Sequence, residues 1–236
     1  MENISQSSRK INLAKMVMLM LKHRYFSLFF YEILRRFYSS RFFFVLRRDL
    51  AIPFQTLPAK GPLTLHEIQE DNRDILFKID SKIALNEEAK EMIRRRFLLE
   101  SKIKTCYVAI TEDSKICYVQ WLIGSEENEK LQTFYPEGFP PLAKDEMLLE
   151  GAYTPEPYRS QGIMAHAMSR IAEIGASNGA RWISTVVNKS NIPSLKGCKR
   201  AGFAPFMMKE EKWRLFRRKI RYTLLPKGTP YPFDVK

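Results

Sequence analysis

The residues best suited to chemistry lie in one stretch, Glu150–Met164, whose pattern predicts a strand, a short turn and the start of a helix. Gly162 stands at the predicted helix start, where free backbone N–H groups and the positive end of the helix dipole converge. Arg159 adds a full positive charge three residues earlier. This arrangement favours a phosphate or another anion. Glycine before a helix is also a common cap, so the turn by itself leaves a purely structural interpretation open.

A second segment runs from Asn191 to Phe203 and ends in Gly202-Phe203. Arg159-Ser-Gln-Gly162-Ile-Met164 and this segment resemble two motifs of the Gcn5-related N-acetyltransferase (GNAT) superfamily. The family's patterns are Arg/Gln-x-x-Gly-x-Gly/Ala and Asn-x-x-Ala-x-x-x-Tyr-x-x-x-Gly-Phe. The two motifs stand in the family's order, with a predicted helix and strand between them. The resemblance covers roughly residues 62–225.

The resemblance implies an enzyme that transfers an acyl group from acetyl-CoA, or another acyl-CoA, to a small-molecule amine. In the family, the pyrophosphate binds the turn equivalent to residues 159–164. The pantetheine arm lies along the strand end equivalent to residues 152–154, and the motif asparagine touches its other side. The cofactor-binding residues implied here are Ala152, Tyr153, Thr154, Arg159, Ser160, Gln161, Gly162, Ile163, Met164 and Asn191. No metal is expected.

Two positions depart from the family's pattern. Met164 stands where glycine or alanine is usual, which crowds the helix start. Cys198 stands where many members place a tyrosine that protonates the departing CoA thiolate. A thiol of ordinary pKa, about 8.5, is a conceivable donor, and a packed helix cysteine is the alternative. The departures also motivate a rival function, a non-catalytic binding protein that has kept the fold and associates with a membrane or nucleic acid.

An attacking amine must be neutral, so a general base is expected near the predicted strand 147–154. Glu150 is the best-placed carboxylate, and Glu146 is a weaker candidate. If Glu150 faces the groove, burial raises its pKa toward a useful value. Strand alternation does not determine its face, and on the outer face it would be a solvated glutamate.

The elements that must position these residues alternate between strands and helices. Strands are predicted near residues 63–68, 106–111, 116–123, 147–154, 181–187 and 206–225. Helices are predicted at 71–99, 163–178 and 191–200, and residues 124–145 are predicted to form a long loop. The predicted fold is therefore α/β (α+β), a GNAT-type, mostly antiparallel sheet flanked by helices.

Residues 1–60 are the part that the resemblance does not explain. A connector with Pro53, Pro58, Gly61 and Pro62 separates them from the acyltransferase domain at 61–236. They hold eleven Lys or Arg against three acidic residues, and residues 10–46 are predicted to be helical and aromatic-rich. Three interpretations remain: binding to an anionic membrane surface, binding to nucleic acid, or packing on the domain. The aromatic density favours the membrane over nucleic acid.

Composition limits the remaining possibilities. The net charge is +13 over 236 residues, and 45% of the residues are hydrophobic. No segment approaches the ~20 apolar residues that span a bilayer, and no secretory signal is visible, so a cytoplasmic protein is expected, peripheral on the inner membrane face if residues 1–60 bind the membrane. The three cysteines lack metal-ligand spacing and indicate a reducing compartment. A membrane-facing N-terminus would suit an amino sugar or another small cell-envelope precursor as the acceptor.

Overall fold

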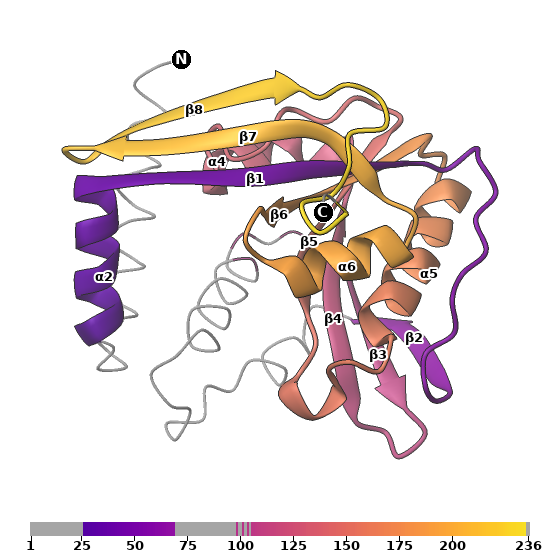
Figure 1. The fold of residues 1–236 in the computed structure, drawn as a ribbon. Coiled ribbons are helices and arrows are strands. Elements are labelled where there is room, and N and C mark those ends of the chain that lie inside the picture. Colours follow the sequence, from indigo (N-terminus) through magenta and orange to yellow (C-terminus); the bar gives the residue numbers. More distant parts are fainter. Residues whose placement is uncertain (1–25, 69–97, 99–100, 102, 104, 235–236) are drawn as a thin grey trace.

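The computed structural model describes residues 26–68, 98, 101, 103 and 105–234. The strands in this part of the chain are β1 (Tyr38–Asp49), β2 (Leu63–Glu67), β3 (Cys106–Thr111), β4 (Ile116–Ile123), β5 (Glu146–Tyr153), β6 (Trp182–Asn188), β7 (Ala204–Arg214) and β8 (Arg217–Leu224). They form one sheet in the order β2-β3-β4-β5-β6-β1-β7-β8 (Figure 1). Only β5 and β6 pair in parallel, and the other neighbours are antiparallel.

The helices described are α2 (Phe26–Phe37), α4 (Asn128–Phe134), α5 (Ile163–Ser177) and α6 (Ile192–Arg200). Helices α5 and α6 cover one face of the sheet (Figure 1), where Met168 and Leu195 pack on strand residues such as Leu46. A second core, around Trp121 and Leu148, lies on the opposite face. The predicted fold class, a mostly antiparallel sheet flanked by helices, is confirmed. None of the described helices is both long enough and apolar enough to cross a membrane.

Elements with strong local signals lie where the sequence predicts them. The hairpin β3–β4 has the predicted bounds, and α5 begins at the predicted residue. The long loop predicted at 124–145 is wrong in part, because it contains a short 3-10 helix, Ser125–Glu127, and α4. There Asn128 exchanges two hydrogen bonds with the backbone of Leu142, and Leu131 is buried. The helix predicted at 71–99 lies, except for Leu98, outside the described residues.

The first part of the chain differs most from its prediction. The helix predicted over residues 10–46, as far as it is described, ends at Phe37, and residues 38–49 form a strand. This strand, β1, pairs with β6 on one side and β7 on the other. Phe43–Leu46 are buried in succession, as expected of a strand covered on both faces. The helical prediction is therefore wrong for residues 38–46, and this segment supplies a central strand.

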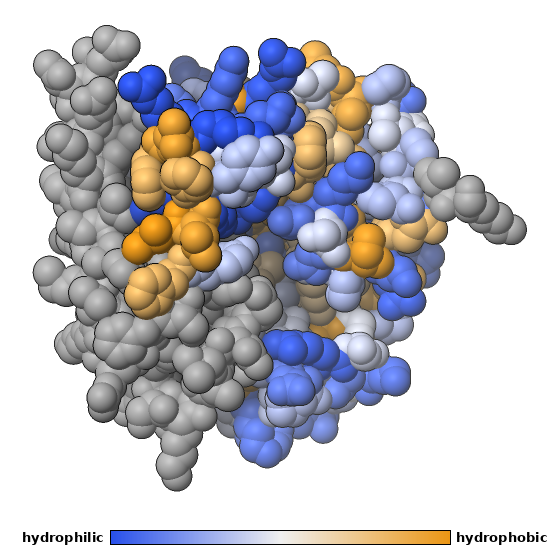
Figure 2. All heavy atoms as spheres, turned by 60° about the vertical axis from the view of Figure 1, so that its left-hand side comes forward, coloured by the Kyte–Doolittle hydropathy of each residue, from blue (hydrophilic) through white to orange (hydrophobic). Residues whose placement is uncertain are grey.

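Arginines of α2 and β1 form contacts within the protein. Arg35 Nη1 lies 3.3 Å from Glu211 Oε1, and Arg41 pairs with the same oxygen. Arg47 forms an ion pair with Glu146 at 2.5 Å. Arg48 is buried and donates to the carbonyl of Ala201 at 3.1 Å. These four arginines therefore attach α2 and β1 to neighbouring elements of the protein. Large apolar side chains stay exposed near α2 (Figure 2).

Candidate functional site

The two parallel strands at the centre of the sheet pair along only part of their length. Pairing joins residues 146–149 of β5 to residues 182–185 of β6 and then stops, although the strands continue to Tyr153 and Asn188. Within the described residues, the edge of residues 150–153 therefore lies outside the ladder between β5 and β6. Backbone N–H and C=O groups on such an edge are suited to bind an extended ligand.

A bulge in β5 lies directly beside this edge. The register with β4 shifts between Val119 and Trp121, opposite Gly151, whose φ is +68°. A Cβ atom at Gly151 would lie 2.6 Å from Leu98 Cδ1 and 2.8 Å from Trp121 Cε3. Only glycine fits this position, both because of the left-handed φ and because of the close approach. Bulges bend the strand that carries them, so the bulge at Gly151 changes the direction of the end of β5.

The turn after β5 ends in a helix start with open donors. Ser160 has φ +64°, and Gly162, the residue before α5, has φ +78°. No side chain caps α5, and the first i to i−4 bond runs from His166 N–H to the Gly162 carbonyl at 3.0 Å. The preceding N–H groups of the first turn have no acceptor within the helix. Together with the helix dipole they form a place for a phosphate.

Arg159 lies at the surface of this turn. Its Nε donates to the carbonyl of Thr154 at 3.1 Å, which ties the guanidinium to the end of the preceding strand. Gln161 likewise donates to the carbonyl of Pro157 at 2.9 Å. The turn is also held from outside, because the N–H of Lys60 donates to the carbonyl of Gln161 at 2.9 Å. The conformation of residues 154–162 is thus fixed by side-chain and backbone bonds.

Met164 occupies the space between the first turn of α5 and helix α6. A Cβ atom at Gly197 would lie 2.8 Å from Met164 Sδ, so the absence of a side chain at Gly197 makes room for the thioether. The departure of Met164 from the family's pattern is therefore matched by a glycine on the facing helix. A ligand that passes between the helices must move this side chain, which has three rotatable bonds.

The second motif has structural roles that its sequence partly predicts. Asn191 caps α6, since its Oδ1 accepts from the N–H of Ser194 at 3.2 Å, with Pro193 in the first turn. Cys198, a residue of α6, is fully buried in the core between the helices and the sheet. Burial raises the pKa of its thiol to about 12, which makes it a weaker acid than a free thiol. Contact of Asn191 with pantetheine and proton donation by Cys198 stay predictions.

The structure determines the face that Glu150 occupies. Glu150 pairs in register with Trp121, and cross-strand partners share a face. Trp121 belongs to the core opposite α5 and α6, so the half-buried Glu150 lies across the sheet from the helix start. Glu146, the weaker candidate base, is engaged by Arg47 and also accepts from the N–H of Ala143.

Two buried polar residues near the site were missed from the sequence. Lys209 donates to the Gly138 carbonyl at 2.6 Å, and burial lowers the pKa of its ammonium to about 8 despite the charges of Glu211 and Glu150. Gln120 is fully buried and accepts from the Tyr118 hydroxyl at 2.7 Å. Within the described structure its Nε2 has no hydrogen-bond partner. A glutamine in the apolar run Ile116–Ile123 was the available signal.

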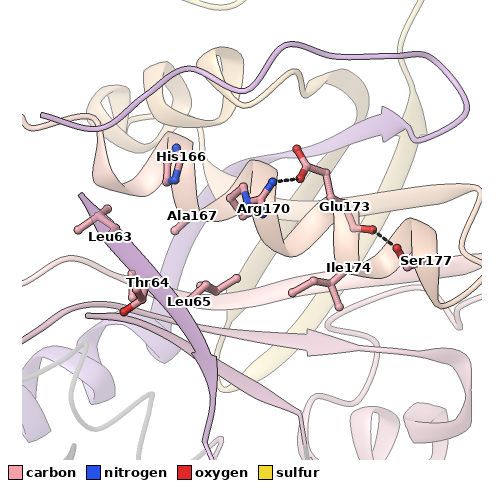
Figure 3. A pocket seen from close by; sticks show the side chains of 10 residues that line it. Leu63, Thr64, Leu65, His166, Ala167, Arg170, Glu173, Ile174 and Ser177 are labelled. Carbon is pink, nitrogen blue, oxygen red and sulfur yellow. Dashed lines mark hydrogen bonds and ion pairs between the residues drawn. The ribbon is translucent and has the colours of Figure 1, made fainter. Parts of the chain in front are cut away.

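A separate groove of about 430 Å³ lies along the side of α5 that faces β2 (Figure 3). Its polar lining includes Arg170 and Glu173, which form an ion pair at 2.6 Å, and His166, which bonds to the carbonyl of Leu57 at 3.1 Å. None of the predicted site residues lines it. We therefore place the candidate site at the end of β5 and the turn before α5.

Comparisons with known proteins concern the fold. No protein family and no curated protein matches the chain. A GCN5-related glucosamine N-acetyltransferase region of a fungal multi-domain β-N-acetylglucosaminidase is similar, with a TM-score of 0.52 and 11% identity over 84% of this chain and 22% of that one. A GNAT-family acetyltransferase from Colwellia psychrerythraea gives 0.49 and 10% identity over 81% and 59% of the two chains.

A GCN5-related N-acetyltransferase from Sphaerobacter thermophilus gives a TM-score of 0.47 and 12% identity over 84% and 56% of the two chains. The chain spans less than two thirds of the length of the first structures that it matches. At these identities the likeness concerns the architecture alone. The chain has the fold of the Gcn5-related N-acetyltransferase superfamily.

Proposed function

We propose that the chain is an N-acyltransferase that moves an acetyl or other acyl group from acyl-CoA to a primary amine. One observation carries the proposal: the end of β5 that lies outside the β5–β6 ladder leads directly into a turn whose helix start has no side-chain cap. The edge suits an extended arm with amide groups, as in pantetheine. The turn, with Arg159, suits the pyrophosphate at the other end of that arm.

In this proposal Glu150 acts on the acceptor from the opposite face of the sheet. Its carboxylate takes a proton from the amine as the nitrogen forms a bond to the acyl carbon. The carbon–sulfur bond breaks, and the departing thiolate takes a proton from Cys198 or from water. The end of β5 outside the β5–β6 ladder is the place where a thioester would be reached from both faces.

The acceptor class that we propose first is an amino sugar or another small cell-envelope precursor, because contact with a membrane would bring the protein to such substrates. The rival is a non-catalytic binding protein with the same fold. It is favoured by Met164, which fills the space beside α6, and by the buried Cys198. Release of free thiol from acetyl-CoA, screened over pools of amines, supports the enzyme. Binding of acetyl-CoA without release of thiol in the presence of any of the amines supports the rival.

Replacing Arg159 by alanine tests the cofactor site. We expect the Kd for acetyl-CoA, measured by calorimetry, to rise about tenfold to a hundredfold, because a charged hydrogen bond contributes about 1.5–3 kcal/mol. The matched control is Arg170→Ala, since Arg170 is an exposed arginine on α5 that pairs with Glu173 beyond the turn. An equal Kd for wild type and Arg159→Ala contradicts the assignment of the turn. Absence of thermal stabilisation by millimolar acetyl-CoA contradicts both functions.

A further inference from the structure

One apolar stripe of helix α2 faces away from the protein. Phe30, Leu34 and Phe37 follow the i, i+4, i+7 spacing of one helix face, and they are 61%, 68% and 51% exposed. Helices at a protein surface ordinarily bury such a stripe. The neighbouring arginines point the other way: Arg35 pairs with the buried Glu211, and the Arg36 guanidinium lies 5.6 Å from the centre of the Trp213 ring. Ion pairing therefore attaches the helix and leaves its apolar stripe outside.

The turn between β7 and β8 extends this apolar surface. It consists of Leu215 and Phe216, which are 67% and 57% exposed and have φ of +47° and +64°. Two-residue hairpins with two positive φ values strongly favour Asn-Gly, because a Cβ is strained in this region. The backbone N–H groups of Leu215 and Phe216 donate to the carbonyls of Phe37 and Arg36. The Phe37 and Phe216 rings are in edge contact at 6.3 Å.

Together these residues form one surface, the apolar tip: Phe30, Leu34, Phe37, Leu215 and Phe216. Helix α2 and the β7–β8 turn lie at the same end of the molecule (Figure 1), and apolar residues gather there beside strongly polar ones (Figure 2). Large apolar side chains at strained turn positions destabilise the isolated protein. Their exposure suits contact with an apolar partner.

The surroundings of the apolar tip are basic. Arg214, Arg217, Lys219 and Arg221 are exposed along the turn and the edge strand β8. On the neighbouring strand Glu210 pairs with Lys212 at 2.7 Å. An anionic partner with an apolar interior matches this combination.

We propose that the apolar tip inserts into the interfacial region of an anionic phospholipid bilayer, while the basic residues of the turn and β8 meet the head groups. A second copy of the chain is disfavoured as the partner, because each copy carries a net charge of +13. Nucleic acid is disfavoured because two of the five side chains of the tip, Leu34 and Leu215, offer no ring for base stacking. The proposal does not depend on acyltransferase activity.

The test is co-sedimentation of the full chain with vesicles of phosphatidylglycerol and phosphatidylcholine in equal amounts. The decisive variant is Leu215→Asn with Phe216→Gly, which removes two apolar side chains and supplies the residues that this turn favours. We expect its partition coefficient to fall at least tenfold, while its Tm rises by a few degrees. A variant that is more stable than wild type but binds vesicles more weakly shows that these two side chains serve membrane binding and not packing. The matched control, Leu224→Asn, removes an exposed leucine at the far end of β8 and should bind as wild type does.

The basic residues are tested separately. Arg217→Gln and Lys219→Gln should each weaken binding about fivefold at low salt, and the difference should disappear near 1 M salt. Lys227→Gln, at an exposed lysine beyond β8, is the control. Equal vesicle binding by wild type and the turn variant overturns the proposal, as does failure of the wild type to bind anionic vesicles. The proposal is also overturned if the wild type does not bind vesicles but forms a dimer, or a complex with single-stranded DNA, that the turn variant abolishes.

Discussion

Glu211→Gln should lower the free energy of unfolding by about 3 kcal/mol at pH 7. Burial by itself raises the pKa of this carboxyl, but Arg41, Arg35 and Lys209 outweigh it and hold the pKa at about 2. Compared with the ordinary value of 4.5, this difference corresponds to about 3 kcal/mol at 1.36 kcal/mol per pKa unit. Urea denaturation of the two proteins measures it. The glutamine variant leaves two arginines and a buried lysine without their counter-charge.

The pH dependence gives this prediction a second readout. Because the folded state lowers the pKa of Glu211, its contribution is complete above pH 4.5 and is lost as the pH falls toward about 2. The stabilities of wild type and Glu211→Gln should therefore converge below pH 4.5. Glu210→Gln is the control, because Glu210 pairs with the half-exposed Lys212 and should contribute less than about 1 kcal/mol. A difference between wild type and Glu211→Gln that persists unchanged at pH 2 contradicts the ion-pair explanation.

Local signals explain which parts of the fold are predictable from the sequence. The β3–β4 hairpin is marked by two apolar runs around Glu112–Lys115, and α5 by a glycine at each end. Both follow from residues that are adjacent in the chain. Capping of α6 by Asn191 is predictable for the same reason, since its acceptor and donor are three residues apart.

Strand β1 is not predictable in this way. Its partners are residues 182–188 and 204–214, more than 130 residues further along the chain. A run such as Phe42–Leu46 has no period that separates a strand buried on both faces from a helix. The arginines around this run also favoured the helical prediction, because basic residues between apolar ones are typical of the solvated face of a helix. Their acceptors, Glu146, Glu211 and the Ala201 carbonyl, come from distant strands and loops.

The residues of the candidate site also differ in whether a local sequence signal predicts them. The turn Arg159–Met164 is recognisable because the function proposed for it requires an arginine, a glycine and a helix start within a few residues. The face of Glu150 is not, because the bulge at Gly151 interrupts the alternation of β5. Lys209 has no local signal, since three separate parts of the chain, around Phe43, Phe139 and Tyr222, create its surroundings.

Glu150→Gln should lower kcat about 10²- to 10⁴-fold while the KM for acetyl-CoA changes little. The substitution keeps the size of the side chain beside Trp121 and removes its ability to take a proton. The proposed CoA-binding turn lies on the opposite face of the sheet, which is why the KM should be spared. Thiol release with the amine identified by screening provides the measurement.

The dependence of this loss on pH distinguishes a base from a structural glutamate. As the pH rises, more of the amine is already neutral, so the deficit of Glu150→Gln should shrink steadily toward high pH. A residue needed only for folding would lower activity by the same factor at every pH and would also lower the Tm. Glu156→Gln, an exposed glutamate in the turn after β5, is the matched control and should retain wild-type turnover. Wild-type kcat in Glu150→Gln at neutral pH would remove Glu150 from the mechanism and leave Lys209, with its pKa of about 8, as the next group to test on that face.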